Sequence, residues 1–256
     1  MVREIKSKDN RIYKECQKLG QKKYRDKAGK YLIEGPNLVE EAIFNKADVE
    51  CVIFDDNKDW PQIQGIDNYR MEHRIFEKIA QTETSQGILA VVKKKQYDSD
   101  YLMEKMRAGA NLLVLDRLQD PGNIGTMIRT AEGAGYSAIV AVKGTADIYS
   151  PKTIRAAAGS VFRIPIVHVE DNRELRKLTD RLGKRLVVTC FDTDNYYYDV
   201  NLKTDTALVI GNEGNGVSAE LIEMADVKIK IPMSGRLESL NASVAAGILM
   251  YEAARK

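Results

Sequence analysis

The stretch TALVIGNEGNGVSAEL, from Thr206 to Leu221, indicates the fold class of the chain. Its first five residues form an apolar run, and a strand that is apolar on both faces is typical of a parallel sheet covered by helices on both sides. A loop with three glycines and a single carboxylate, Glu213, follows directly. Glycines permit close ligand approach, and ligands of such sheets bind at the carboxyl ends of strands. The stretch therefore predicts a wound α/β domain with a binding loop after this strand.

The same alternation of strands and helical stretches runs from residue 111 to the C-terminus. The predicted strands there are NLLVLD, AIVAV, RIPIV, RLVVTC, TALVI and VKIKIPM. Before residue 95 the pattern predicts a smaller α/β module, with helices over about 4–27, 36–46 and 73–81 and strands at 30–35, 49–55, about 69–72 and 87–93. We therefore expect two domains, 1–95 and 111–256, joined by a connector over 96–110.

Composition excludes several classes of protein. The chain has 256 residues, of which 44% are hydrophobic, so it can bury one large core or two modest ones. It contains no apolar run near the roughly 20 residues needed to span a bilayer, and its N-terminus has no signal-peptide apolar region. A soluble cytoplasmic protein is expected. Cys16, Cys51 and Cys190 form no C-x-x-C pair, so we expect neither a disulfide framework nor a metal site.

Signatures of several enzyme classes are absent or misplaced. The sequence has no Walker motif, no G-x-S-x-G motif and only two histidines, which gives no support to a phosphate-loop enzyme or a Ser-His-Asp hydrolase. Residues 133–138 (GAGYSA) match the G-x-G-x-x-G/A dinucleotide pattern. That pattern must follow a strand and open a helix, whereas here it ends a helix and precedes the strand AIVAV. We interpret it as a helix C-cap.

Basic residues are concentrated at the N-terminus although the net charge of the whole chain is only +2. The first 30 residues contain eleven Lys or Arg and four acids, an excess of seven positive charges. Such an excess attracts phosphates, and it predicts an RNA-binding segment in which Lys22, Lys23 and Arg25 are the candidate contacts. A solvated helix face is the alternative explanation.

Two further segments contain candidate site residues. In the stretch LDRLQDPGNIGTMIRTAEGAG, Asp120 can cap a helix on which Gly122, Gly125 and Arg129 share one face, so Arg129 could clamp a ligand there. The alternative is that the glycines only let the helix pack tightly on its strand. The second segment, IPMSGRLESLNASVAAGILMYEAARK, ends in a helix rich in small residues, which can pack close to another backbone within the domain or across a dimer.

Three motifs together carry a family resemblance. DPGNIGTMIRTAEGAG (120–135), IGNEGNGVS (210–218) and IPMSGRLESLNASVAAGILMYEAAR (231–255) resemble motifs 1, 2 and 3 of the SpoU/TrmH family of SPOUT RNA 2'-O-ribose methyltransferases, in the family's order. KYLIEGPNLVEEA (30–42) and TETSQGILAVV (82–92) are similar to the L30e-like substrate-binding domain of the ribosomal RNA members. One departure is Ala242, where valine is commoner in the family.

The resemblance implies a fold and a cofactor. The expected fold is an N-terminal L30e-like α/β module followed by a C-terminal SPOUT domain, whose mostly parallel sheet contains a deep trefoil knot that holds S-adenosylmethionine. By position, the cofactor contacts are expected at Gly211, Ile231 and Leu240, with Thr189 and Cys190 ending a nearby strand. A homodimer is expected as well.

The resemblance also implies a reaction site. Its expected residues are Arg129 and Asn123 of motif 1, Glu213 of motif 2, and Ser239 and Asn241 of motif 3. The motif 1 arginine has been assigned as a base in related enzymes, but an arginine pKa above about 12 favours a guanidinium that binds the adjacent phosphate and lowers the pKa of the 2'-hydroxyl. Glu213 could orient Arg129 or accept the proton through water.

The leading hypothesis is therefore a methyltransferase that acts on a ribose 2'-hydroxyl, with large-subunit (23S) ribosomal RNA as the expected substrate. A transfer RNA substrate is the alternative within the same enzyme class. A noncatalytic RNA-binding protein for ribosome assembly is the alternative from another class.

Overall fold

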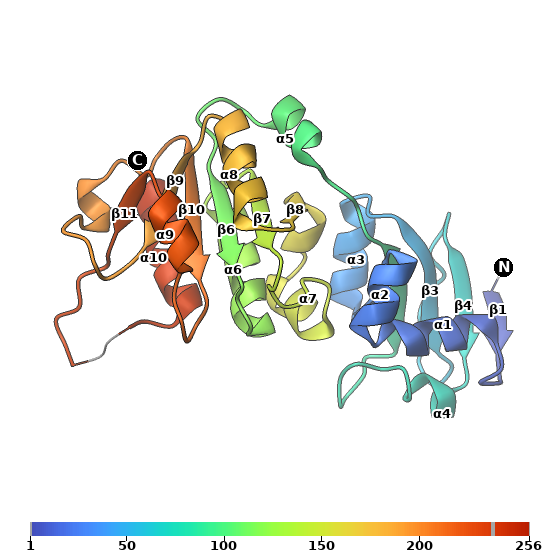
Figure 1. Cartoon of the computed structure of the whole chain (residues 1–256). Helices are drawn as coiled ribbons and strands as arrows, with labels where there is room; N and C mark the ends of the chain where they lie inside the picture. The colour runs from blue at the N-terminus through green and yellow to red at the C-terminus, as the bar shows by residue number, and fades with distance from the viewer. Residues whose placement is uncertain (1, 237–238, 256) are drawn as a thin grey trace. The chain divides into compact units, whose positions relative to one another are not determined.

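The structure is a computed structural model that describes residues 2–236 and 239–255 (Figure 1). Its contacts divide the chain into two compact units. One unit contains residues 1–95 together with 149–155, and the other contains residues 96–148 and 156–256. Each unit has its own hydrophobic core.

The first unit is built on a mixed sheet whose described strands follow the order β1-β4-β3-β5-β2. The pairs β1–β4 and β3–β4 are parallel, and β3–β5 and β2–β5 are antiparallel. Its strands are β1 (Val2–Ile5), β2 (Lys30–Glu34), β3 (Val49–Asp55), β4 (Asp67–Met71) and β5 (Ile88–Lys93). Its helices are α1 (Arg11–Leu19), α2 (Lys22–Ala28), α3 (Pro36–Phe44) and α4 (His73–Phe76), and most of α7 (Pro151–Ala157) is grouped with this unit.

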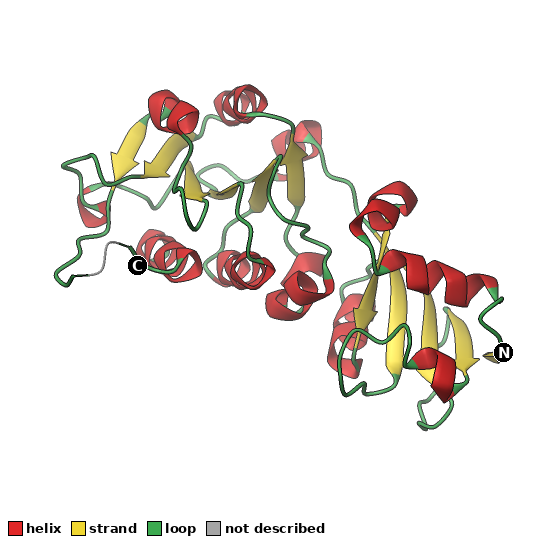
Figure 2. Cartoon of the chain, turned by 60° about the horizontal axis from the view of Figure 1, so that its bottom comes forward, coloured by secondary structure: helices red, strands yellow, loops and turns green. Residues whose placement is uncertain are grey.

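The second unit contains the sheet that the opening stretch predicted. Its described strands lie in the order β11-β9-β10-β6-β7-β8, and the pairings between them are parallel. Helices cover both faces of this sheet (Figure 2). Its strands are β6 (Leu112–Asp116), β7 (Ala138–Val142), β8 (Ile166–Val169), β9 (Arg185–Thr189), β10 (Thr206–Gly211) and β11 (Val227–Ile229). Its helices are α5 (Ser99–Lys105), α6 (Pro121–Gly133), α8 (Asn172–Arg181), α9 (Ala219–Met224) and α10 (Ala242–Ala253), with short 3-10 turns η1 (Ser160–Phe162) and η2 (Tyr197–Asp199).

Burial explains why these strands take central positions. Strands β6, β7 and β10 are buried along their whole length, which confirms the prediction of a parallel sheet covered on both faces. One face of the sheet packs against α8, where Leu175 and Leu178 join the same core as Val114, Val140 and Val209. On α6 and α10, which lie side by side, small residues allow a close approach.

The predicted helix over 4–27 is wrong. Val2–Ile5 forms an edge strand on β4 instead, and the helical part is divided into α1 and α2. Asn10 starts α1 by accepting a hydrogen bond from the Ile12 amide at 2.8 Å, and the chain leaves the helical conformation at Gln21, which is extended and precedes α2. The pairing partner of β1 lies more than 60 residues away in sequence, so no local pattern indicates it.

The end of β3 is joined to the start of α4 by a histidine and a buried carboxylate. His73 Nδ1 lies 2.8 Å from Asp55 Oδ2, and His73 Nε2 lies 3.4 Å from Glu77 Oε1. The hydrogen bond to Asp55, with smaller contributions from the charges of Asp55, Glu77 and Asp56, raises the pKa of His73 above its usual value near 6.5.

We expect this pair to make the stability of the first unit depend on pH. Because the folded-state pKa of His73 is raised, its contribution is fully present below the unfolded pKa and is lost as pH rises through the folded pKa. Urea unfolding followed by the single tryptophan, Trp60, reports on this unit. The difference in unfolding free energy between the wild type and His73→Gln should therefore shrink as pH is raised from about 6 to about 8.

The matched control is His168→Gln, which changes the other histidine of the chain, on β8 in the second unit. It should leave the pH dependence of the Trp60 transition unchanged. A His73→Gln difference that is constant over this pH range would show that the ion pair contributes nothing.

Candidate active site

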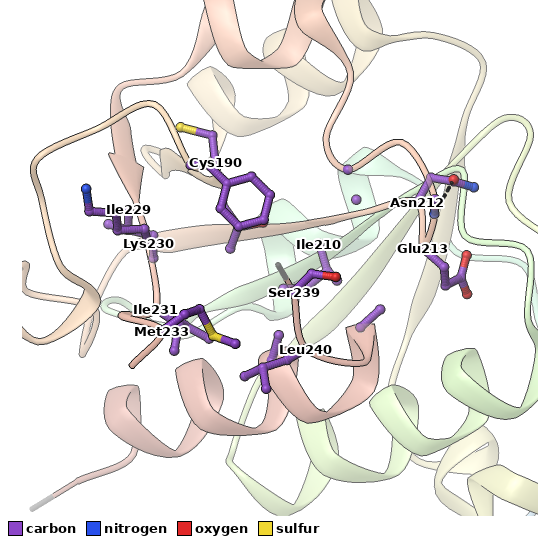
Figure 3. Close-up of a pocket in the computed structure, with 17 residues that line it drawn as sticks. Cys190, Ile210, Asn212, Glu213, Ile229, Lys230, Ile231, Met233, Ser239 and Leu240 are labelled. Carbon is purple, nitrogen blue, oxygen red and sulfur yellow. Dashed lines mark hydrogen bonds between the residues drawn. The ribbon is translucent and has the colours of Figure 1, made fainter. Parts of the chain in front are cut away.

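A cavity of about 270 Å³ lies at the carboxyl ends of β9, β10 and β11. Figure 3 shows Ile231, Met233 and Leu240 close together on one side of it, and Asn212 and Glu213 on another. Its lining comes from four segments: Thr189–Phe191, Ile210–Gly214 with Gly216, Ile229–Ile231 with Met233, and Ser239, Leu240, Ala242 and Ala245. All five residues expected to contact the cofactor, Thr189, Cys190, Gly211, Ile231 and Leu240, are among them.

The backbone of the motif 2 loop folds tightly over Gly211. Asn212 and Gly216 exchange backbone hydrogen bonds at 3.0 and 2.9 Å, and Gly216 adopts a positive φ of 67°. A Cβ atom at position 211 would lie 2.1 Å from the Val217 amide nitrogen and 2.2 Å from the Gly216 carbonyl carbon. Only glycine therefore fits at position 211, and the loop leaves backbone, rather than a side chain, facing the cavity.

Asn212 holds this loop in place but is not among the site residues predicted from the sequence. Its side-chain amide donates to the Arg117 carbonyl at 2.9 Å, and its side-chain oxygen accepts from the Gly214 and Asn215 amides at 3.0 and 3.1 Å. An Asn followed by Gly two residues later is a signal for such an Asx turn. The signal was available but does not by itself distinguish a turn from a site.

Glu213 connects motif 2 to the start of α6. Its carboxylate accepts hydrogen bonds from the backbone amides of Gln119 and Asp120, both at 3.0 Å, and from the Asn123 side chain at 3.2 Å. Burial raises the pKa of Glu213, but these hydrogen bonds together outweigh it and the net pKa is lowered. An ionised carboxylate with its acceptor sites in use is better suited to fix a loop than to accept a proton.

The same connection continues into motif 3. The Asn241 amide donates to Asn123 Oδ1 at 3.1 Å, while Asn241 Oδ1 caps α10 by accepting from the Ser243 and Val244 amides. Asp120 caps α6 as predicted, through a 2.6 Å hydrogen bond from the Gly122 amide. The chain from Glu213 through Asn123 to Asn241 therefore joins the three motifs around the cavity.

Arg129 lies apart from this network. It is exposed on α6 and is not among the residues that line the cavity of its own chain. Within residues 2–236 and 239–255, no hydrogen bond or ion pair to its side chain is found, and so none to Glu213. Ser239, by contrast, lines the cavity directly.

The small-residue helix α10 packs closely on α6 and still leaves an apolar stripe exposed. A Cβ atom at Gly133 would lie 3.4 Å from the Tyr251 hydroxyl, and one at Gly247 would lie 4.0 Å from Thr130 Cγ2. Val244 and Tyr251, seven residues apart and hence on one side of α10, are 51% and 58% exposed. Packing within the domain therefore uses only part of the apolar surface of this helix.

Of the three candidate RNA contacts, Arg25 serves the fold of the first unit. Lys22 and Lys23 are exposed at the start of α2. Arg25 is only 5% exposed, and its guanidinium donates to the Leu19 carbonyl at 2.7 Å. This burial and the internal hydrogen bond argue against the expected role of Arg25 in RNA binding, because one of its guanidinium nitrogens is used at the break between α1 and α2.

Cys190 and the other cysteines are free thiols, and burial raises the pKa of the Cys190 thiol. A protonated thiol is a poor nucleophile, so Cys190 shapes the cavity rather than reacting. No cluster of His, Cys, Asp and Glu that could hold a metal ion is found among the described residues. In the same part of the chain, no helix is long and apolar enough to cross a membrane.

Comparisons with known proteins match both units. Residues 110–251 match the SpoU rRNA Methylase family, and residues 10–90 match the MRM3-like substrate binding domain. The chain is 38% identical over 98% of its length to the 23S rRNA (guanosine(2553)-2'-O)-methyltransferase RlmP of Bacillus subtilis, of which it covers 98%. It is 28% identical over its whole length to the 23S rRNA (uridine(2479)-2'-O)-methyltransferase of Streptomyces viridochromogenes, of which it covers 93%.

Solved structures of RNA-modifying enzymes also match this chain. An AdoMet-bound rRNA methyltransferase from Sinorhizobium meliloti superposes with a TM-score of 0.88 at 30% identity, over 99% of this chain and 98% of that one. The superposition with a TrmH/SpoU tRNA modifying enzyme from A. aeolicus, also 30% identical, covers 58% of this chain and 76% of that enzyme, with a TM-score of 0.51.

Gly211→Ala should disrupt the cavity without unfolding the chain. The added Cβ would overlap the backbone atoms of Gly216 and Val217, so the loop must shift to make room for it. Overpacking of this kind costs about 1–3 kcal/mol. We expect at least about a tenfold loss of S-adenosylmethionine affinity in calorimetry. Gly247→Ala is the matched control, because Gly247 does not line the cavity, and its Cβ would come no closer than 4.0 Å to Thr130 Cγ2 and should leave the affinity nearly unchanged. Equal affinities for both variants would contradict this account of the loop.

Proposed function

The chain belongs to the SpoU rRNA Methylase family, and we propose that it transfers a methyl group from S-adenosylmethionine to a ribose 2'-hydroxyl of large-subunit ribosomal RNA. The observation that carries this proposal is the cavity at the carboxyl ends of β9, β10 and β11, with three motifs joined around it by the Glu213–Asn123–Asn241 network. A noncatalytic RNA-binding protein would not need this cavity or this network.

The cavity suits S-adenosylmethionine. The side chains of Ile210, Ile231 and Leu240 provide apolar contact surface, and the backbone around Gly211 approaches the cavity without a side chain between. The cofactor carries no phosphate, so the absence of a phosphate loop agrees with it. When bound, it supplies an activated methyl group on a sulfonium centre.

The residues of the chain then have separate roles. Glu213, Asn123 and Asn241 hold the loops of the three motifs in a fixed geometry, which is how alignment lowers the barrier of a two-substrate reaction. Ser239 offers a hydroxyl at the cavity. Arg129 provides a permanent positive charge that binds the phosphate next to the acceptor ribose and favours ionisation of its 2'-hydroxyl.

A homodimer would bring Arg129 to a cavity. Arg129 is exposed and lies outside the cavity of its own chain, and the stripe of Val244 and Tyr251 on the neighbouring helix α10 is left exposed. We propose that a second copy buries this stripe and that the Arg129 of one subunit then acts at the cavity of the other. We further place the protein in the cytoplasm and assign no metal to the reaction.

Large-subunit ribosomal RNA is favoured over transfer RNA by the extent of the similarity. The two 23S rRNA methyltransferases correspond to nearly the whole chain, including the first unit, whereas the tRNA modifying enzyme corresponds to 58% of it. Mapping of 2'-O-methyl groups in RNA from deletion and complemented cells tests the assignment. A restored mark in transfer RNA would move the substrate to the alternative class, and no restored mark would argue for a noncatalytic protein.

Arg129→Ala should abolish methyl transfer and leave S-adenosylmethionine binding nearly intact, because Arg129 is absent from the cavity lining. If Arg129 acts across a dimer, an equal mixture of Arg129→Ala and Gly211→Ala subunits should recover about a quarter of wild-type activity, since half of the dimers are mixed and each has one complete site. The assay is run at a low S-adenosylmethionine concentration, at which the Gly211→Ala variant alone is nearly inactive. Tritium transfer to 23S rRNA after subunit exchange measures the recovery. A mixture that recovers no activity would assign Arg129 to the site of its own chain. A protein that sediments as a monomer and is fully active would lead to the same conclusion.

The basic N-terminal segment should supply phosphate contacts. Each lost contact reduces the dependence of log affinity on log salt by roughly 0.7 to 0.9. The double variant Lys22→Gln, Lys23→Gln should therefore bind 23S rRNA more weakly, with a salt slope smaller by about 1.4 to 1.8 in filter binding. Lys46→Gln, another lysine of the first unit, is the control. An unchanged slope would identify the segment as a solvated surface.

A further inference from the structure

Phe191 is an exposed aromatic ring at the rim of the cavity. It directly follows Cys190, it lines the cavity, and it is 71% exposed. A single exposed apolar residue needs no explanation in itself. The backbone that carries this one is fixed, however, and the ring is next to the proposed site of methyl transfer.

The loop formed by residues 190–197, here called the Phe191 loop, is fastened to β11 and its extension along its whole length. The backbone amide of Cys190 donates to the Ile229 carbonyl at 3.0 Å, and Thr193 Oγ1 donates to the Lys228 carbonyl at 3.2 Å. The Lys230 amide donates to the Asn195 carbonyl at 3.0 Å, and the Tyr197 amide donates to the Lys230 carbonyl at 3.1 Å.

These hydrogen bonds fix the backbone that carries the exposed Phe191 ring. A rigid loop loses little conformational freedom when a ligand covers its exposed ring, and that favours binding. The strand to which the loop is bonded leads directly into Ile231, which lines the cavity, so the backbone at Phe191 keeps a fixed place relative to the cofactor site.

The Phe191 loop and the residues next to it also contain further aromatic rings and balanced charge. The Lys230 ammonium lies 5.4 Å from the centre of the Tyr196 ring, and Tyr196 stacks on Tyr198 with 5.4 Å between ring centres. The acids Asp192 and Asp194 of the loop are matched in number by Lys228 and Lys230. This balance gives the loop no excess positive charge to attract phosphates, so what it offers a nucleic acid is stacking.

An exposed aromatic ring at the rim suits the proposed reaction. A ribose 2'-hydroxyl can enter the cavity only if its nucleotide leaves the stack of the RNA, and unstacking costs free energy. Stacking of the displaced base on an aromatic side chain compensates that cost. Phe191 lines the same cavity as Ile231 and Leu240, but its ring is 71% exposed at the rim and offers surface to a nucleotide that approaches from outside.

We propose that Phe191 is the surface on which the base of the methylated nucleotide stacks. This assignment rests on the proposed function, because it requires an RNA nucleotide as substrate. It also makes Phe191 a residue that selects for an unstacked nucleotide, since a nucleotide held in a helix cannot cover the ring.

The test compares Phe191→Leu, which keeps an apolar side chain, with Phe191→Trp, which keeps an aromatic one. With a full-length 23S rRNA transcript, Phe191→Leu should raise the KM for RNA about tenfold and Phe191→Trp should stay close to the wild type. The S-adenosylmethionine affinity, the thermal midpoint and the sedimentation coefficient should not change. The salt slope of RNA binding should not change either, because no charge is altered.

Several outcomes would overturn the assignment. An unchanged KM in Phe191→Leu, or an equal loss in Phe191→Trp, excludes stacking. A lower S-adenosylmethionine affinity would assign the ring to the cofactor, and an altered sedimentation coefficient would assign it to a subunit contact. If the wild-type protein methylates no ribosomal RNA, the proposed function itself is refuted. If the wild type is active but the Phe191 variants behave otherwise than expected, only the Phe191 assignment fails.

Discussion

The arrangement of the site depends on the hydrogen bonds that the Glu213 carboxylate accepts. Two come from consecutive backbone amides, Gln119 and Asp120, at the point where the chain enters α6. Amides at a helix start lack partners within the helix, and a carboxylate there satisfies them and is favoured by the helix dipole. The interaction is local, yet it connects loops that follow two adjacent strands, β6 and β10. Without it, the amides of the motif 1 turn and the side chain of Asn123 lose the acceptor that they share.

This constraint separates two kinds of residue that the family motifs group together. Glu213, Asn123 and Asn241 have their hydrogen-bonding atoms engaged with one another or with the backbone, so they shape the site. Ser239 and Arg129 are exposed and are available to a substrate. Because the carboxylate of Glu213 is already in use, the role of proton acceptor that the sequence allowed for it receives no support from its contacts.

Local patterns predicted the second unit better than the first. Apolar runs such as Thr206–Ile210 are long and continuous, and burial on both faces is their consequence, so their sheet was predictable. The edge strand Val2–Ile5 has no such pattern, and it forms because β4 offers free hydrogen-bonding groups. Of the site, the glycines and the motif residues were recognisable. The burial of Arg25 and the exposure of Phe191 were not, since both depend on where tertiary contacts place a side chain.

The order of strands in the second sheet also bears on how this unit folds. Strand β10 lies between β9 and β6, and Ala207 is paired with Leu112, from which it is separated by most of the unit's sequence. Contacts between residues so far apart close large loops and slow folding. During synthesis, β6, β7 and β8 emerge well before β10, and until β10 arrives they present an unpaired edge. The loop after β10 can form only when that strand has been inserted, so the cofactor cavity is completed late, and a chain interrupted before residue 206 would have the start of α6 without the carboxylate that orders it.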